Sequence, residues 1–202
     1  MTSGTALVRV GCCGFRSSRE AYYEELDSVE VQHTFYQPPQ VSTLRRWREE
    51  APAGFEFTLK AWQLITHDSK SPTYRRLKRP LDDEERASCG GFRDSAIVRS
   101  ALKRSLDCAK LLRASMLLFQ SPASFRPEPE NEARLRHFIA QIARPQCPPG
   151  LRLAWEPRGT AWTQHAQLAI ELCRSSGWST SSIRSSTRFV QPPDPRICDC
   201  TA

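Results

Sequence analysis

The strongest limit on the fold of this chain is a repeated alternation of short strand-like runs with amphipathic helical segments. Apolar, β-branched or alternating runs predict strands at 7–12, 29–32, 55–60, 115–120 and 151–156. Helical spacing of apolar residues predicts helices at 19–26, 41–51, 95–112, 129–144 and 161–176. The stretch 65–93 has no clean period, and we expect a long loop there with at most one helical turn. Because strand and helix alternate, we expect an α/β fold with a parallel sheet covered by helices.

Such a sheet is either open and doubly wound or closed into a barrel. The glycine-rich phosphate loops of many open sheets, G-x-G-x-x-G and G-x-x-x-x-G-K, do not occur in the sequence. Polar side chains instead gather at the carboxyl ends of the expected strands, where a (β/α) barrel carries its chemistry. They are Glu30, Gln32, Lys60, Gln120, Glu156 and Arg158. The pattern favours a barrel.

Length and composition predict one domain without a membrane span. The chain has 202 residues, of which 39% are hydrophobic, and this is enough for a single sizeable core. No apolar run approaches the ~20 residues of a membrane span, and residues 1–10 lack the features of a secretory signal. We therefore expect a cytoplasmic protein.

Cysteine spacing and charge give weaker information. The eight cysteines show no C-x-x-C or His/Cys ligand spacing, so we expect no metal site. Cys198 and Cys200 form a lone C-x-C without partners. The net charge of +7 favours phosphate-bearing partners, and it also fits a solvated, arginine-rich surface. The sequence identifies no cofactor.

Several ordered motifs resemble a known family. They are GCCGF at 11–15, EVQHTFY at 30–36, PAGFEFTLK at 52–60, ITH at 65–67, LFQSPASF at 118–125 and WEPRG at 155–159. In this order they resemble the YecE-like family, also called domain of unknown function 72, whose members are TIM-type barrels. The resemblance covers about 8–177 and implies a TIM-type (β/α) barrel for this chain.

The resemblance implies a pocket at the mouth of the barrel. We expect Glu30 and Glu156 to form an acid and base pair, with His67 as a further acid, base or hydrogen-bond donor. The alternative for each glutamate is an ordinary ion pair with a nearby cation. The candidate catalytic residues are therefore Glu30, His67 and Glu156.

A second set of residues is expected to bind a ligand. Lys60 and Arg158 suit an anionic or sugar-phosphate ligand, or equally an internal ion pair with the two glutamates. Gln120 is expected to orient a ligand or a loop through its amide. The candidate ligand-binding residues are Gln32, Tyr36, Lys60, Gln120 and Arg158. Aromatic rings that could supply stacking walls, or simply pack the barrel, are Phe35, Tyr36, Trp155 and Trp162.

The sequence changes character after Gly177. Residues 178–188 are rich in serine and arginine, which is typical of irregular chain. The resemblance implies instead an apolar strand followed by Asp, and later an Arg-x-His-Gly strand. With GC-rich codons and one lost base, the shifted frame reads Leu-Val-His-Val-Val-Asp-Pro-Phe and then Asn-Leu-Arg-Leu-His-Gly. We therefore expect an incomplete barrel over 1–177, with about five βα units and strands six to eight missing, and an irregular, out-of-frame tail over 178–202.

Three functional interpretations stay open. The first is an enzyme of the hydrolase, lyase or isomerase type that acts on an anionic or sugar-like small molecule at the barrel mouth. The second is a nucleic-acid-binding or nuclease-like barrel, which the basic charge favours; the single His and two Glu of the pocket are few for a nuclease metal cluster. The third is an inactive truncated fragment, because strands six to eight would supply one side of the pocket.

Overall fold

The computed structural model describes residues 9–180, which form a six-stranded parallel sheet with covering helices. The strands lie side by side in chain order, so each strand pairs with its neighbours in sequence. They are β1 (Gly11–Cys13), β2 (Ser28–Val31), β3 (Glu56–Lys60), β4 (Met116–Ser121), β5 (Arg152–Pro157) and β6 (Ser179–Thr180). The predicted α/β fold with a parallel sheet is confirmed, and β1 and β6 form the two edges of the described sheet.

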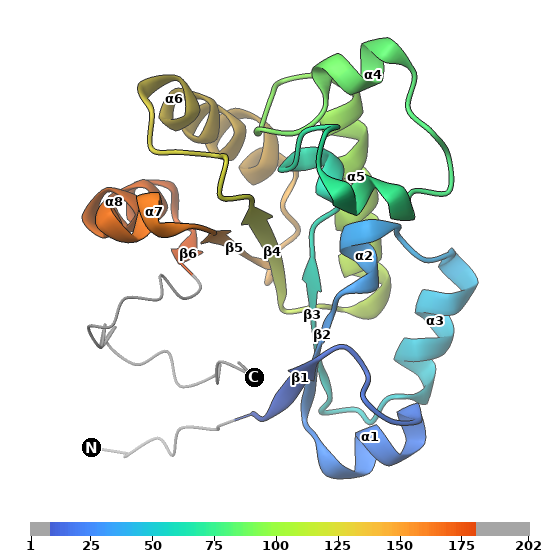
Figure 1. The fold of residues 1–202 in the computed structure, drawn as a ribbon. Helices are drawn as coiled ribbons and strands as arrows, with labels where there is room; N and C mark the ends of the chain where they lie inside the picture. The colour runs from blue at the N-terminus through green and yellow to red at the C-terminus, as the bar shows by residue number, and fades with distance from the viewer. Residues whose placement is uncertain (1–8, 181–202) are drawn as a thin grey trace, which may run out of the picture.

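The helices lie around the outside of the fan of strands (Figure 1). The α-helices are α1 (Arg19–Glu25), α2 (His33–Tyr36), α3 (Val41–Glu50), α4 (Asp83–Ser88), α5 (Ala96–Leu112), α6 (Pro129–His137), α7 (Thr160–Gln164) and α8 (Ala166–Ser176). Shorter 3-10 and π-helical pieces are η1 (Gln63–Ile65), η2 (Pro72–Arg76), η3 (Phe138–Ala143) and η4 (Arg144–Gln146). The helix predicted at 95–112 is confirmed, and the one predicted at 161–176 is divided into α7 and α8 at His165.

Alternation along each strand separates two faces of the sheet. Leu59 of β3 pairs in register with Leu117 of β4, and both side chains are fully buried. They belong to one large core with Leu44 of α3 and Leu102 of α5, so this face of the sheet packs against the helices. Successive side chains of a strand point to opposite faces. The intervening positions, such as Lys60, therefore belong to the inner face.

The segment 65–93 is more regular than its sequence pattern predicts. It contains η2 and α4, and α4 begins with a capping box formed by Asp82 and Glu85. The Gly90 N–H donates to the Leu64 carbonyl at 2.8 Å, which ties the end of the segment to its start. The expectation of a long loop with one helical turn is therefore wrong where η2 and α4 lie, because these helices are too short to show a period.

Ordered packing continues past Gly177. Trp178 is buried, and its ring stacks on Phe119 with the centroids 4.7 Å apart. The short strand β6 then pairs with β5, so a sixth strand is present although strand six was expected to be missing. Residues 181–202, including Cys198 and Cys200, lie outside the described residues. The boundary at Gly177 and the shifted reading frame stay predictions.

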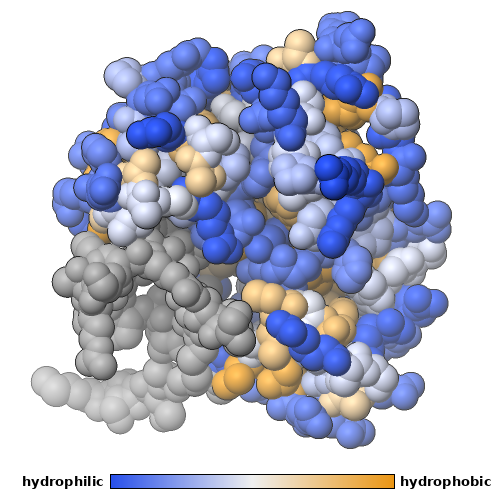
Figure 2. Space-filling model, viewed as in Figure 1, coloured by the Kyte–Doolittle hydropathy of each residue, from blue (hydrophilic) through white to orange (hydrophobic). Residues whose placement is uncertain are grey.

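The viewed surface is mainly hydrophilic, with a hydrophobic group of residues over the β1 end of the sheet (Figure 2). Among large hydrophobic side chains of the described part, Val10 and Val41 are exposed. Within residues 9–180, no helix has both the length and the apolar character needed to cross a membrane.

Gly90 is expected to be the least replaceable glycine of the segment 65–93. Its φ is +74°, and a Cβ there would lie 2.2 Å from the backbone oxygen of His67. Gly150 is a matched control, because its φ is +81° and a Cβ there would meet no atom within 4 Å. We expect Gly90→Ala to lower the free energy of unfolding in urea by roughly 3 kcal/mol or more, and Gly150→Ala by about 1 kcal/mol. Equal losses in the two variants would contradict the close approach of Gly90 to His67.

Candidate functional site

Glu30 and Lys60 form a largely buried ion pair at the carboxyl ends of β2 and β3. Glu30 pairs in register with Thr58, and Lys60 follows two residues later on the same face. The Lys60 Nζ atom lies 3.6 Å from Glu30 Oε1, and the two side chains are 10% and 22% exposed, respectively. A cation and a carboxylate are thus held together at the inner face.

A second group lies at the ends of β4 and β5. Gln120 pairs in register with Glu156, so the two side chains are neighbours on the inner face. The Gln120 Nε2 donates to Glu156 Oε2 at 3.1 Å, and a terminal guanidinium nitrogen of Arg158 lies 2.5 Å from Glu156 Oε1. The Arg158 side chain is 55% exposed, whereas that of Glu156 is 11% exposed. Glu156 is therefore held by two donors, and one of them remains accessible to solvent.

The charge of Glu156 acts on the carboxyl group of Glu30. Burial raises the pKa of Glu30; the positive charge of Lys60 opposes this shift, and the negative charge of Glu156 adds to it. The net result is a Glu30 pKa above its ordinary value. Glu30 therefore takes up a proton more readily than an exposed glutamate, which suits acid and base chemistry.

His67 lies just beyond β3 and is held as a neutral imidazole at pH 7. Its ring packs edge-on against Phe35 with centroids 4.9 Å apart, and its Nδ1 lies 2.8 Å from Thr66 Oγ1. Burial lowers the pKa of His67 to about 4; Asp68 opposes this shift and the charge of Lys60 adds to it. Lys60 therefore acts on both His67 and Glu30, so these three predicted residues share one electrostatic environment.

Gln32 contacts Glu30 directly, whereas Tyr36 is connected to the site through the ring of Phe35. The Gln32 Nε2 donates to Glu30 Oε1. The guanidinium of Arg76 lies over the Tyr36 ring, with the guanidinium carbon 4.2 Å from the centroid. Phe35 contacts the rings of both Tyr36 and His67 and so connects Tyr36 to the site.

Two of the aromatic rings considered as stacking walls belong to the core instead. Trp155 and Trp162 are 0% and 1% exposed. Their rings meet edge to face with centroids 4.8 Å apart. Trp155 alternates with Glu156 along β5, so it points toward the helices and away from the mouth.

Cys13 is a site residue that the sequence analysis missed. It pairs in register with Glu30, and its thiol contacts Glu30 Oε1 with an Sγ to oxygen distance of 3.9 Å. The first strand was expected at 7–12, but β1 ends at Cys13. Polar residues at the carboxyl ends of the expected strands are the site candidates. Cys13 would have been among them if the end of the first strand had been placed one residue later.

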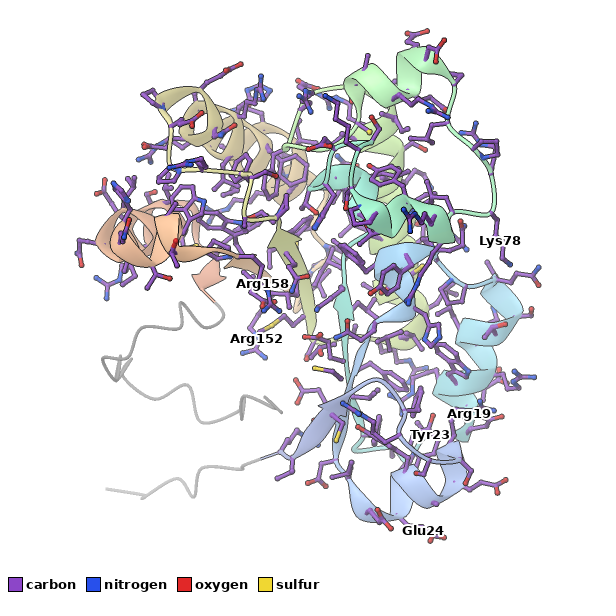
Figure 3. All side chains as sticks on the ribbon, in the orientation of Figure 1. Arg19, Tyr23, Glu24, Lys78, Arg152 and Arg158 are labelled. Atoms are coloured by element: carbon purple, nitrogen blue, oxygen red, sulfur yellow. The ribbon has the colours of Figure 1, made fainter. Side chains whose placement is uncertain are left out.

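The opposite end of the inner face is also charged. Glu56 lies at the start of β3, where its carboxylate contacts Arg9 at 3.0 Å and Arg152 at 3.7 Å. Figure 3 shows Arg152 and Arg158 on the same side of the sheet; Arg152 is the first residue of β5, and Arg158 follows its last residue. The apolar cluster on this face, between the charged ends, is Met116, Leu118 and Ala154. Among residues 9–180, the carboxyl ends of the strands are the place where charged groups lie beside the buried imidazole of His67.

The groups at the mouth can bind an anion and move a proton. Lys60 and Arg158 supply positive charge, Glu30 and Glu156 supply carboxyl groups, and His67 supplies a neutral ring nitrogen. In the part of the chain that the structure describes, no group of three or more His, Cys, Asp or Glu side chains could hold a metal ion.

Acid should destabilise the protein partly through His67. Its pKa is lowered from 6.5 to about 4. Between pH 6.5 and about pH 4, His67 is therefore protonated in the unfolded chain but neutral in the folded chain. Stability from this source is present above about pH 6.5 and lost toward pH 4, and it amounts to about 3 kcal/mol. His67→Gln should flatten the pH dependence of urea unfolding in this range. The exposed His165 provides the control variant His165→Gln, and identical pH profiles for all three proteins would contradict the buried, neutral imidazole.

Comparison with solved structures gives the same fold. The chain is similar to a DUF72 family protein from Enterococcus faecalis V583, with 20% identity, a TM-score of 0.57, and coverage of 87% of this chain and 62% of that one. It is also similar to a DUF72 family protein from Thermotoga maritima MSB8, with 20% identity, a TM-score of 0.55, and coverage of 86% of this chain and 64% of that one. The chain thus spans less than two thirds of the length of either structure.

Comparison with family models gives a match over residues 13–199, to the family described as "Protein of unknown function DUF72". The matched range extends past Gly177, the point at which the resemblance seen in the sequence ends. Among curated proteins no match was found. Because the family match covers most of the sequence and the fold agrees with family structures, the chain belongs to the DUF72 family.

Proposed function

We propose that this chain carries the site of an enzyme of the hydrolase, lyase or isomerase type, which moves a proton on an anionic, sugar-phosphate-like ligand at the barrel mouth. The observation that carries the proposal is the pair of carboxyls, Glu30 and Glu156, on one face. Each has its own cation, and the pKa of Glu30 is raised. Carboxyls in different environments are typical of sites in which one group donates and another accepts a proton.

In this proposal each side chain has a separate task. Glu30 exchanges the proton, because burial favours its neutral form and Lys60 favours its charged form. Arg158 binds the anionic group of the ligand, since much of its surface is exposed. Neutral His67 offers a hydrogen bond or a second proton position, and Gln120 orients Glu156.

The competing explanation is that the ion pairs only stabilise the inner face. Both explanations use the same contacts, so they differ only in what happens when a ligand is added. A largely buried Lys60 beside a carboxyl of raised pKa is an expensive arrangement for stability alone. This cost favours a functional role.

Binding of sugar phosphates tests the first half of the proposal. Aldose and ketose phosphates, with inorganic phosphate alongside, should bind the full chain in a calorimetric titration. Lys60→Met and Arg158→Gln should each weaken binding by about tenfold, because each removes a charged contact. Arg174→Gln, an exposed arginine in the last turn of α8 and thus at the other end of the strands, should leave binding unchanged. The proposal would be contradicted if Lys60→Met and Arg158→Gln bind as tightly as the unaltered chain. It would also be contradicted if no binding occurs at millimolar ligand.

Proton exchange tests the second half. Any sugar phosphate that binds should exchange a carbon-bound hydrogen with D2O or undergo conversion, as followed by NMR. Glu30→Gln should reduce the rate by about 100-fold or more while binding persists, since a carboxamide cannot accept the proton. Unchanged turnover in Glu30→Gln would remove Glu30 from the mechanism.

We also propose the cytoplasm as the location of this activity. Five cysteines of the described part are free thiols, and they are Cys12, Cys89, Cys108, Cys147 and Cys173. Free thiols are the usual state in a reducing compartment. Cell fractionation of a tagged full chain would test the location.

A further inference from the structure

A basic groove lies on the outer layer of the molecule, remote from the mouth. It is a cavity of about 620 Å³ between α3 and α5. Its walls include Val41, Arg45 and Arg48 of α3, and Arg104 and Lys110 of α5. Both helices pack on the face of the sheet opposite to Glu30 and Lys60. The groove is therefore separate from the candidate functional site.

Positive charge in this groove exceeds negative charge. Five cations line it, namely Arg45, Arg48, Arg104, Lys110 and Arg113, against two acidic residues, Glu49 and Asp107. Asp107 already pairs with Lys103 at 3.0 Å. The acidic side chains of the groove therefore do not neutralise its positive charge.

Two of the cations have structural partners. Arg48 donates to the carbonyls of Phe55 at 3.0 Å and Pro52 at 2.7 Å. Arg104 donates to the Pro39 carbonyl at 2.5 Å. The other three side chains have neither an ion pair nor a hydrogen bond within residues 9–180. They are Arg45, Lys110 and Arg113.

The chain holds Arg113 in this position against two local preferences. Arg113 has φ 49° and ψ 46°, a left-handed conformation that favours glycine after the end of a helix. Its charge also repels a neighbour, since burial lowers the pKa of Arg48 and the charge of Arg113 lowers it further. An arginine at a strained backbone position next to another arginine points to a task for its side chain.

The helix dipole explains part of this arrangement. Lys110 and Arg113 lie at the C-terminal end of α5, where cations are favourable. The dipole does not account for Arg45 on the neighbouring helix, or for a cavity between the two helices. A bound anion of several charges accounts for all three free cations together.

We propose that the groove between α3 and α5 binds a small polyphosphate-bearing molecule. Its volume lies within the range of about 300–1,000 Å³ that is usual for small-molecule sites. Arginine forks suit phosphate oxygens, and Lys110 adds a point charge. Val41 and Leu111 line the same cavity and offer apolar contact to a non-phosphate part of the ligand. The site is independent of the sugar-phosphate site at the mouth.

Inorganic tripolyphosphate is the probe for the test, titrated calorimetrically into the full chain at low salt. Arg113→Gly and Arg45→Gln should each weaken binding by about tenfold, whereas Arg126→Gln should not. Arg113→Gly should also raise the melting temperature of the free protein, because glycine relieves the left-handed strain and the repulsion of Arg48 ends. Weaker binding by a more stable variant cannot be explained by damage to the fold.

Lys60→Met separates this site from the mouth. Tripolyphosphate affinity should survive Lys60→Met if it binds in the groove, even if the proposed function at the mouth fails. Loss of binding in Lys60→Met with retention in Arg113→Gly would overturn the groove proposal. The same holds if tripolyphosphate does not bind at millimolar concentration, or if only long nucleic acids bind and a short polyphosphate does not compete with them.

Discussion

The two-residue period of the parallel strands is the constraint on which the rest of this structure depends. It sends Leu59 and Leu117 toward the helices and leaves Lys60 and Gln120 on the opposite face. One set of positions then builds the core, and the other set builds the site. Because strands in parallel register end together, polar residues from strands far apart in sequence meet at one end of the inner face.

Burial of charge at this end determines its chemical character. Lys60 and Glu30 are costly to bury separately, and each makes the other tolerable. Lys60 does not fully offset the burial of Glu30, since the pKa of Glu30 remains raised. Burial and the charge of Lys60 also lower the pKa of His67. Both groups are thereby biased to neutral forms that can exchange protons or hydrogen bonds with a ligand. The outer groove differs from this end of the sheet, because Arg45, Lys110 and Arg113 remain exposed to solvent.

Much of the fold could be predicted from sequence because it follows local periodicity. The helix at 96–112 has a clear apolar stripe and a serine cap, and the strand at 56–60 alternates visibly. The site could also be predicted in outline, since Glu30, Lys60, Gln120 and Glu156 stand at strand ends. Short elements escaped prediction: α4 depends on a capping box rather than a period, and β1 ends one residue later than its pattern implies. The groove between α3 and α5 depends on which helix faces are neighbours, which a single sequence does not reveal.

The central claim is that the charge of Glu156 acts on Glu30 across one face of the sheet. An NMR titration of the Glu30 side-chain carboxyl carbon, in the unaltered chain and in Glu156→Gln, tests it most directly. The account predicts a Glu30 pKa above the ordinary glutamate value in the unaltered chain, and a lower one in Glu156→Gln, because the variant removes a repelling negative charge. An ordinary Glu30 pKa that is the same in both proteins would contradict the account.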